Sequence, residues 1–489
     1  MKAVHKLIIT EIMCVVVELL NNYGRSVTMN KKRSILFLVL VIIMSMLVAA
    51  CAEKTNNTPS PSSTNNSNAK ASEKPSQAPS QSPEPVIELD FWTFWGSETR
   101  RPIIEKMIED FNNSQDRIVV KHTFLPWGDV WTKNLAAIAA GNPPDVIIND
   151  INTVAQRAVS KQAVNLSEFL AKDNIESRFF PELWNTVVHE GEAYALPFNT
   201  DTRFLFYNKE AFKEVGLDPE KPPTTWAELE EYAIKLDKKN GNRYERVGFY
   251  PNGWGNWGWD SWMTNADDGI GFVDKEGNVT INTPKKVEAL KWINTWTDRL
   301  GESTVNAFKA EFGSQQADPF ISGKVAMINQ TATFYTQLRD YGQNVDFGIA
   351  PIPEYEPGSG HYSSGGGFVI EIPYGAKNPE ASWEFMKFMT DVDAQEYWAI
   401  KNFDNVANIE ASNKAAQNSE LDDKGKMVYS EAVKNLEVTK LFPIPYFAPD
   451  FRSLLNPEAE AALLGQATPE KALEKAQAEV ENLIKMNKK

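Results

Sequence analysis

Stretches in which apolar and polar residues alternate are interspersed with stretches in which apolar residues recur every three or four positions. The first kind predicts strands, and three lie near the start of the folded part: "VIELDFW" (86–92), "RIVVKHTF" (117–124) and "PDVIIND" (144–150). The second kind predicts two intervening helices, one with an apolar face of Ile103, Ile104, Met107, Ile108 and Phe111, and one over 131–140 that Gly141 ends. This alternation predicts an α/β fold with a mostly parallel sheet covered on both faces.

Two segments follow the ends of predicted strands and are therefore candidates for ligand binding. In an open parallel sheet, ligands bind beyond the carboxyl ends of the strands. Residues 92–98 follow the first strand, and residues 149–152 follow the third. We expect binding side chains in both segments.

The beginning of the chain has the three-part pattern of a secretory signal. In "MNKKRSILFLVLVIIMSMLVAAC" a basic start precedes an apolar run from Ile35 to Leu47, which is too short to span a membrane, and then small residues. "LVAAC" resembles the bacterial lipoprotein signal, in which the cysteine becomes the lipidated first residue. We therefore expect residues 1–50 to be an upstream segment and signal peptide, with Met29 as the true start and Cys51 as the lipidation site. An uncleaved anchor is the alternative.

The composition after Cys51 changes twice. Residues 52–85 have no aromatic side chain and are rich in Ser, Pro, Asn and Lys, so we expect 51–85 to be a lipidated cysteine and disordered tether. The rest is long enough for two or three domains. Because the only other cysteine is Cys14, an intrachain disulfide is not expected after cleavage. The net charge of −15 argues against nucleic acid and against adsorption to anionic lipid, so the membrane link would be the anchor alone.

The stretch "GWGNWGWDSW" (253–262) holds four of the 14 tryptophans, spaced by glycines. Its spacing fits neither a helix nor a strand, and glycine disfavours a helix by roughly 1 kcal/mol relative to alanine. Large rings in a loop usually face a ligand or a partner. We expect a loop with exposed or half-exposed rings here.

Six segments of the chain resemble, in the same order, the family 1 extracellular solute-binding proteins. They are "LDFWTFWG", "AAGNPPDVI", "YALPFNTDTRFLFYNKEAFKEVGLDPEKPPTTWAEL", "FISGKVAMINQ", "FGIAPIP" and "NPEASWEFMKFMT". This family supplies the sugar-capturing subunits of ABC importers and includes the maltodextrin-binding proteins. The similarity runs from about residue 86 to the C-terminus.

The resemblance implies a two-lobed α/β fold, each lobe a mostly parallel sheet flanked by helices, with the ligand cleft between the lobes. The chain would cross between lobes near residues 199–202 and again near 352–354. The N-terminal lobe would then comprise 86–199 plus 354–390, and the C-terminal lobe 200–353 plus 391–489.

The resemblance also implies the site residues. Aromatic rings stack on the C–H faces of a sugar, while carboxylates and amides bind its hydroxyls. The positions that match are Trp95, Asn149, Asp150, Asn199, Asp201, Trp254, Trp257, Trp259 and Gly366. For Asp150 and Asp201 a structural cap or hinge hydrogen bond is the alternative, and for Gly366 a bare tight turn. Where the family often has a further tryptophan, this chain has "TATFY", with Phe334 or Tyr335 as substitutes. "KNFDNVANIE" lacks a proline common in the family.

The function implied is a monomeric, lipid-anchored protein outside the cytoplasmic membrane that captures a carbohydrate for ABC transporter permease subunits. It would be no enzyme and would need no cofactor or metal: the four histidines are scattered, and phosphate-loop and serine-nucleophile motifs are missing from the sequence. A glycoside hydrolase needs only two suitably spaced carboxylates, so it remains an alternative. A sugar-binding component of a sensor system is another.

Overall fold

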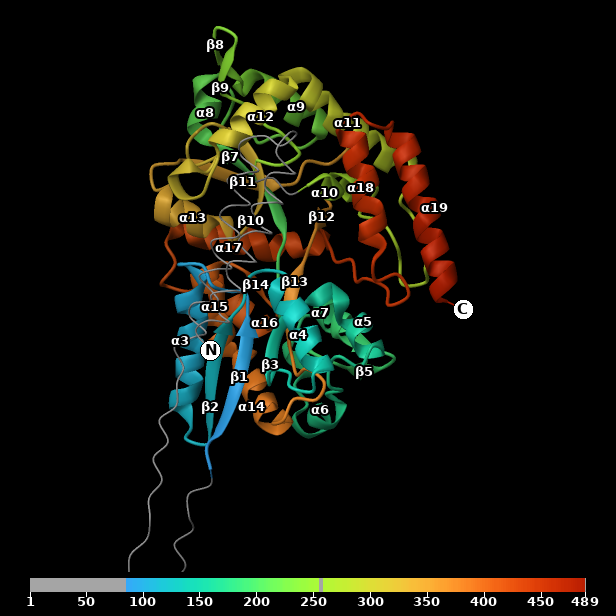
Figure 1. The fold of residues 1–489 in the computed structure, drawn as a ribbon. Helices are drawn as coiled ribbons and strands as arrows, with labels where there is room; N and C mark the ends of the chain where they lie inside the picture. The colour runs from blue at the N-terminus through green and yellow to red at the C-terminus, as the bar shows by residue number, and fades with distance from the viewer. Residues whose placement is uncertain (1–84, 255–257, 489) are drawn as a thin grey trace, which may run out of the picture. The chain divides into compact units, whose positions relative to one another are not determined.

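The computed structural model of the protein describes residues 85–254 and 258–488. In these ranges the hydrophobic side chains form two cores: the first surrounds a six-stranded sheet and reaches one face of a three-stranded sheet, and the second lies on the other face of that three-stranded sheet. Figure 1 shows the two groups of elements, one around the blue and cyan strands and one around the green and yellow strands. The predicted α/β fold with two lobes is confirmed.

The first sheet has six strands, and these include the three strands predicted between residues 86 and 150. In spatial order they are β14 (Asn405–Val406), β6 (Leu196–Thr200), β13 (Gly367–Glu371), β3 (Val146–Asp150), β1 (Ile87–Thr93) and β2 (Ile118–Phe124). Because β1 pairs in parallel with β2 and β3, and β13 is antiparallel to both β3 and β6, four strands share one direction. Their carboxyl ends, together with the beginnings of β13 and β14, lie at one edge, which we call the carboxyl edge.

Helices pack around this sheet. They are α3 (Arg100–Ser114), α4 (Asp129–Ala139), α5 (Val154–Val159), α6 (Ser167–Asp173), α7 (Pro181–Val187), α14 (Pro379–Met389), α15 (Val392–Asn402), α16 (Ile409–Ala415) and α17 (Asp423–Asn435), while α13 (Phe334–Tyr341) packs against the three-stranded sheet of the second group. The helix α3 buries all five apolar residues that its spacing predicted. Burying a side chain of this size stabilises the fold by roughly 1.5–3 kcal/mol, which is why the periodicity is informative.

The second sheet has three strands, β10 (Met327–Thr331), β7 (Arg203–Asn208) and β11 (Phe347–Pro351), in that order. Around it lie α8 (Lys209–Glu214), α9 (Trp226–Leu236), α10 (Trp259–Ala266), α11 (Pro284–Leu300), α12 (Glu302–Glu311), α18 (Phe451–Leu463) and α19 (Pro469–Asn487). Both of its pairings are antiparallel, where the resemblance implied a mostly parallel sheet. The reason is that β10 and β11, joined through α13, flank β7 and run opposite to it.

The remaining strands form short two-stranded pairs outside the two larger sheets. They are β4 (Val188–His189) with β5 (Glu192–Ala193), β8 (Lys238–Asn240) with β9 (Arg243–Arg246), and β12 (Ser363–Ser364) with β15 (Thr439–Lys440). The pair β12–β15 brings together two segments that each connect the two groups of elements.

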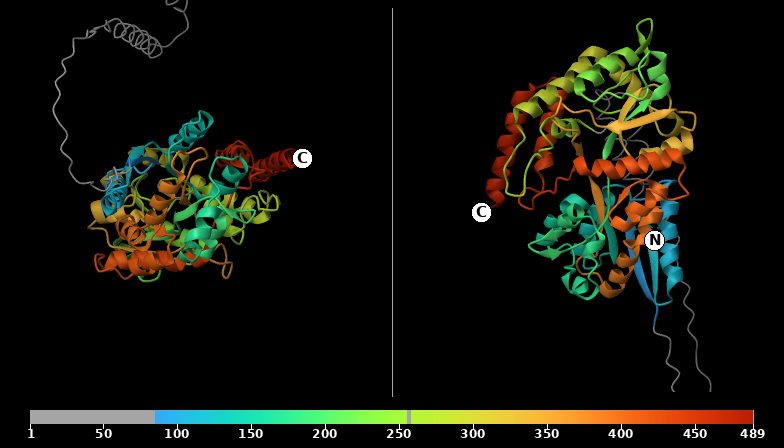
Figure 2. Two further views of the ribbon diagram at one scale, coloured as in Figure 1. Left: turned by 90° about the horizontal axis from the view of Figure 1, so that it is seen from below. Right: turned by 180° about the vertical axis from the view of Figure 1, so that it is seen from behind.

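The chain passes between the two groups three times. The first passage, at Asp201 and Thr202 between β6 and β7, lies within the predicted 199–202. The second runs through β12, further along than the predicted 352–354, because Ile352 still packs in the second core. The third follows α17, which lies along the boundary between the two groups in the view from behind (Figure 2).

The C-terminal helices are divided between the cores. Side chains of α15, α16 and α17 pack in the first core and those of α18 and α19 in the second, whereas the sequence analysis assigned all of 391–489 to the C-terminal lobe. An apolar helix face fits either sheet equally well, so periodicity alone does not decide which one it covers. At the end of α17, Asn435 donates to the Thr202 hydroxyl (2.6 Å) and to the Arg203 carbonyl (3.1 Å), which ties this helix to the first passage.

Candidate functional site

Two carboxylates stand at the carboxyl edge, each held by its neighbours and each able to accept a further hydrogen bond. Asp150 ends the buried strand β3, and its Oδ1 accepts the N–H of Asn152 (2.7 Å). Asp201 follows β6, and its Oδ1 accepts the N–H of Gly366 (2.8 Å) and a guanidinium N–H of Arg203 (3.1 Å). Within the described ranges no donor reaches Oδ2 of Asp201, whereas the Asn152 side chain adds a second hydrogen bond to the Asp150 carboxylate. Each carboxylate is thus oriented by its neighbours and still offers an acceptor.

The electrostatics of this edge favour a neutral hydrogen-bond donor. Burial raises the pKa of the Asp150 carboxyl, and repulsion from the Asp201 charge adds to the rise, although Asn152 and Arg157 oppose it. A ligand hydroxyl that donates to these carboxylates would restore hydrogen bonds that burial removes.

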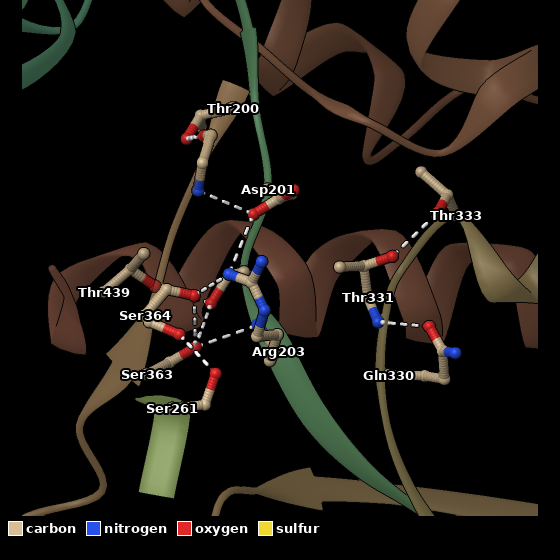
Figure 3. Close-up of polar contacts among 12 residues, drawn as sticks. Thr200, Asp201, Arg203, Ser261, Gln330, Thr331, Thr333, Ser363, Ser364 and Thr439 are labelled. Carbon is tan, nitrogen blue, oxygen red and sulfur yellow. Dashed lines mark hydrogen bonds and ion pairs between the residues drawn. The ribbon is translucent and has the colours of Figure 1, made fainter. Parts of the chain in front are cut away.

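A cavity of about 220 Å³ adjoins this edge and has walls from both groups of elements. It is lined by Asp150, Asn152, Arg203, Asp260, Ser261, Thr264, Phe272, Ser364, Gly365, Phe442, Ile444, Phe451 and Arg452. Figure 3 shows the Arg203 guanidinium directed toward Asp201 and Ser364. On the opposite wall, Arg452 binds Asp260 (3.0 Å) and lies over the ring of Phe272 (4.9 Å).

An aromatic cluster continues the carboxyl edge beyond the first and second strands. Phe94 follows β1, Trp127 follows β2, Trp131 lies on α4 and Phe368 on β13; we call these four residues the aromatic shelf. Phe94 lies 4.7 Å from both the Trp127 and Phe368 rings, and Trp127 lies 4.7 Å from Trp131. The indole of Trp127 is 61% exposed. Phe368 pairs in register with Asp150, so the shelf and the carboxylates are neighbours.

Three residues that the resemblance implied as ligand contacts are instead buried in the first group. Trp95 packs against Phe198 and Trp398. Asn149 donates to the buried Glu371 (2.8 Å), because alternation along β3 turns its side chain away from that of Asp150. Asn199 donates to Asp404 (2.7 Å). Each side chain is used in the structure rather than presented to the cavity.

The tryptophan stretch is largely a packing element. Trp254 is 7% exposed and stacks on Phe308 in the second core, with ring centroids 5.3 Å apart. Trp259 begins α10, is half-buried, and contacts the ring of Phe272 (6.1 Å). Trp257 lies outside the described residues.

The remaining candidate ligand contacts, Gly366, Phe334 and Tyr335, make contacts within the protein. Gly366 brings its backbone against Asp201, whose N–H donates to the Gly366 carbonyl (3.2 Å), so its close approach is to the first passage. Gly367 has the stricter requirement, since its φ is +152° and a Cβ would lie 2.3 Å from the Asn199 carbonyl oxygen. Phe334 and Tyr335 are both buried in the first core.

The sequence analysis missed the aromatic shelf and the arginines. One signal was present: "LPWGDVW" directly follows the second predicted strand, and the strand-end rule applied there points to Trp127. Arg203, Asp260 and Arg452 carry no comparable local signal. They meet at the cavity only because distant segments fold together; Asp260 and Arg452, for example, are 192 residues apart in the sequence.

Residues 95–396, well over half of the chain, match the family of bacterial extracellular solute-binding proteins. The chain belongs to this family. Two strand ends and both lobes contribute to its cavity, which agrees with a role in solute binding. In the described part of this solute-binding protein, no helix is long and apolar enough to cross a membrane.

Relatives of this solute-binding protein differ in the ligand that their names give. The sn-glycerol-3-phosphate-binding periplasmic protein UgpB of Pectobacterium atrosepticum is 24% identical over 421 residues, which cover 80% of this chain and 90% of that one. Two solved structures are similar throughout: CpMnBP1 with mannobiose bound (28% identity, TM-score 0.71) and with mannotriose bound (29%, TM-score 0.70). Each covers 81% of this chain and 100% of its own.

Proposed function

We propose that the protein captures a neutral oligosaccharide between its two lobes and delivers it to the permease subunits of an ABC importer. The observation that carries the proposal is the pairing, at one sheet edge, of two half-coordinated carboxylates with an exposed aromatic shelf. A pyranose offers hydroxyls at its rim and C–H patches on its faces, and these match the two kinds of group. CpMnBP1, which is similar along its whole length, has been solved with such ligands.

The size of the cavity supports an oligosaccharide that extends beyond it. Ordinary ligand pockets measure roughly 300–1,000 Å³, and this cavity, at about 220 Å³, is smaller. Trp127 lies outside the lining of the cavity and is largely exposed. One ring would therefore bind in the cavity while further rings stack along the shelf.

The charges of the site favour a saccharide over glycerol 3-phosphate. Asp150, Asp201 and Asp260 are acidic, and the two nearby guanidinium groups are already engaged, Arg203 with Asp201 and Arg452 with Asp260. A phosphate would have to displace a carboxylate from one of these arginines and would lie near the others. Neutral hydroxyls meet no such repulsion.

Isothermal titration calorimetry on the full chain tests this proposal. The ligands are mannobiose, mannotriose, maltose and glycerol 3-phosphate, each at the same salt concentration. We expect stoichiometric binding of at least one saccharide and weaker or undetectable binding of glycerol 3-phosphate. Tighter binding of glycerol 3-phosphate than of every saccharide would overturn the proposal.

We further propose that the protein binds without turnover. Incubated with its tightest-binding saccharide, it should leave the chain-length distribution of the sugar unchanged by chromatography. Steady hydrolysis would instead favour the glycoside hydrolase. A role in sensing rather than import would be favoured if the genes beside this one encode a sensor kinase and no permease.

The membrane link is proposed to be a lipid on Cys51, which lies outside the described residues, followed by the tether of 52–85. Two acyl chains on one residue hold a protein stably at a membrane, whereas one is marginal. C51A should therefore appear in the soluble fraction or remain unprocessed. Membrane retention of this variant at the normal processed size would contradict the anchor.

A further inference from the structure

A third carboxylate, Asp404, lies at the carboxyl edge on the far side of the first passage from the cavity. It immediately precedes β14, which runs antiparallel to β6, and Asn405 pairs with Thr200, the last residue of β6. The Asp404 side chain therefore lies beside the end of β6, where Asp201 also stands. The Asp201 charge acts on Asp404, since it contributes to raising the pKa of the Asp404 carboxyl, a rise that comes mainly from burial.

One oxygen of Asp404 is held by three donors. Its Oδ2 accepts the amide of Asn199 (2.7 Å), the indole N–H of Trp398 (3.0 Å) and the amide of Asn402. Asn402 is held in turn by Arg100, whose Nε donates to its Oδ1 (3.1 Å). The carboxylate has a fixed orientation because one of these donors comes from strand β6 and the other two from helix α15.

The other oxygen of Asp404 has no such partner. Among the described residues no donor reaches Oδ1, and the residue is only 6% exposed. A buried carboxylate is costly unless hydrogen bonds satisfy it, and all three donors go to Oδ2, which leaves Oδ1 available to a ligand. Asp201 shows the same pattern of one held oxygen and one open oxygen at the same edge.

We propose that Asp404 is a third ligand-contacting residue, whose Oδ1 accepts a hydrogen bond from a hydroxyl of the bound saccharide and selects ligands that carry that hydroxyl. The assignment rests on the proposed function, because it requires a hydroxyl-bearing ligand at the carboxyl edge. It also explains why Asn199 is buried: its amide orients Asp404 rather than touching the ligand.

A purely structural role makes a different prediction. If Asp404 only fastened the segment before β14, its replacement would lower the melting temperature and weaken every ligand by the same factor. A contact to one hydroxyl weakens only those ligands that carry the hydroxyl. The two roles therefore separate on a panel of deoxy sugars.

The test uses D404N, because the three donors fix how the new side chain must sit. Its carbonyl oxygen should replace Oδ2, which places an NH₂ group where Oδ1 accepted the hydroxyl. The probe is the tightest binder among mannobiose, mannotriose and maltose, together with its monodeoxy analogues, measured by calorimetry on the full chain. We expect D404N to bind the unmodified sugar roughly 10- to 150-fold more weakly than the parent protein binds it. The deoxy analogue that lacks the contacted hydroxyl should bind to D404N and to the parent protein with equal affinity.

D318N is the matched control. Asp318 is a half-buried carboxylate whose pKa burial also raises, but it accepts the N–H groups of Phe320 and Ile321 and does not line the cavity. Its replacement should leave the pattern across the deoxy panel unchanged. If D404N does not fold, D404S, which is smaller, is measured in its place.

The outcomes distinguish the two proposals. Unchanged affinity in the Asp404 variant, or an equal loss for every deoxy analogue, would overturn the role of Asp404 and leave the proposed function standing. If the parent protein binds none of the saccharides, the proposed function falls, and the assignment of Asp404 falls with it.

Discussion

Trp127 and Trp254 are the same residue type in two opposite environments. Trp127 follows β2 at the carboxyl edge of the first sheet and is 61% exposed, although its ring contacts three other aromatic rings. Trp254 belongs to the densest tryptophan stretch of the sequence and is 7% exposed, between Tyr250 and Phe308. The isolated tryptophan is presented to solvent, and the clustered one is packed.

The difference shows that position in the fold decides what an indole does. At the end of a parallel strand the backbone leaves the sheet, and a ring there has neighbours on one side only. In the second core, α11 and α12 supply apolar surface that covers the rings of residues 254 and 262. Neither local abundance of tryptophan nor a place after a strand is enough by itself to mark a binding site, since Trp95 follows β1 and is only 1% exposed.

The largest effect is expected when Trp254, the packed tryptophan of the two, is replaced. W254A removes a buried indole and should lower the free energy of unfolding by about 3–5 kcal/mol, with a fall in melting temperature on the order of 10 °C. The fraction that remains folded should bind saccharide with unchanged affinity. Thermal unfolding and calorimetry on the same samples measure both.

W254F is the control, because it keeps a ring against Phe308 and should recover much of the lost stability. The prediction is wrong if W254A melts with the parent protein and loses affinity. The stacking role expected from the sequence would then hold for this residue.

Much of the fold could be predicted because local patterns carry it. The strand–helix alternation from residue 86 to 150 follows from apolar spacing, and all five predicted core residues of α3 are buried. The start of α9 is also fixed locally: the Thr225 hydroxyl accepts the N–H of Glu228 (3.2 Å). Each of these features depends on residues a few positions apart.

The features that could not be predicted depend on distant residues. Which sheet α15 covers, and whether β7 has parallel neighbours, is decided by segments more than 100 residues away. In the site, Asp150 lies in a segment that follows a predicted strand and Asp201 was implied by the family resemblance, and both remain proposed ligand contacts. Nothing local distinguishes Asn199, which serves Asp404, from a residue that faces a ligand.

Replacement of Trp127, the exposed tryptophan, is expected to have a smaller effect. W127A removes a ring that is mostly in solvent, so no cavity forms, and the melting temperature should stay close to that of the parent. Loss of stacking should weaken saccharide binding by about 1–2 kcal/mol, or roughly 5- to 30-fold. Calorimetry with the tightest-binding saccharide measures the loss, and W254A is the matched control with the opposite pair of readouts. A W127A variant that melts far below the parent would place this ring with Trp254.

The smallest effect is expected at the polar part of the edge, where D150N should separate stability from binding. Burial raises the pKa of Asp150 in the folded protein. The folded state therefore holds the proton more tightly than the unfolded state. The stability that this provides is complete below the unfolded pKa of about 3.9 and is lost as pH rises through the raised value.

Asn cannot ionise and caps the turn at Asn152 as well as Asp does, so D150N should melt slightly above the parent at pH 7, with the difference shrinking toward pH 4. Its affinity for saccharide should fall only about 2- to 5-fold, because Asn152 alone holds this side chain and the amide can rotate to present its oxygen to the ligand. Two outcomes would contradict this prediction: D150N melts below the parent at pH 7, or the difference in melting temperature between the two proteins is the same at every pH. Either result would show that burial of the charged Asp150 carboxylate does not destabilise the folded protein.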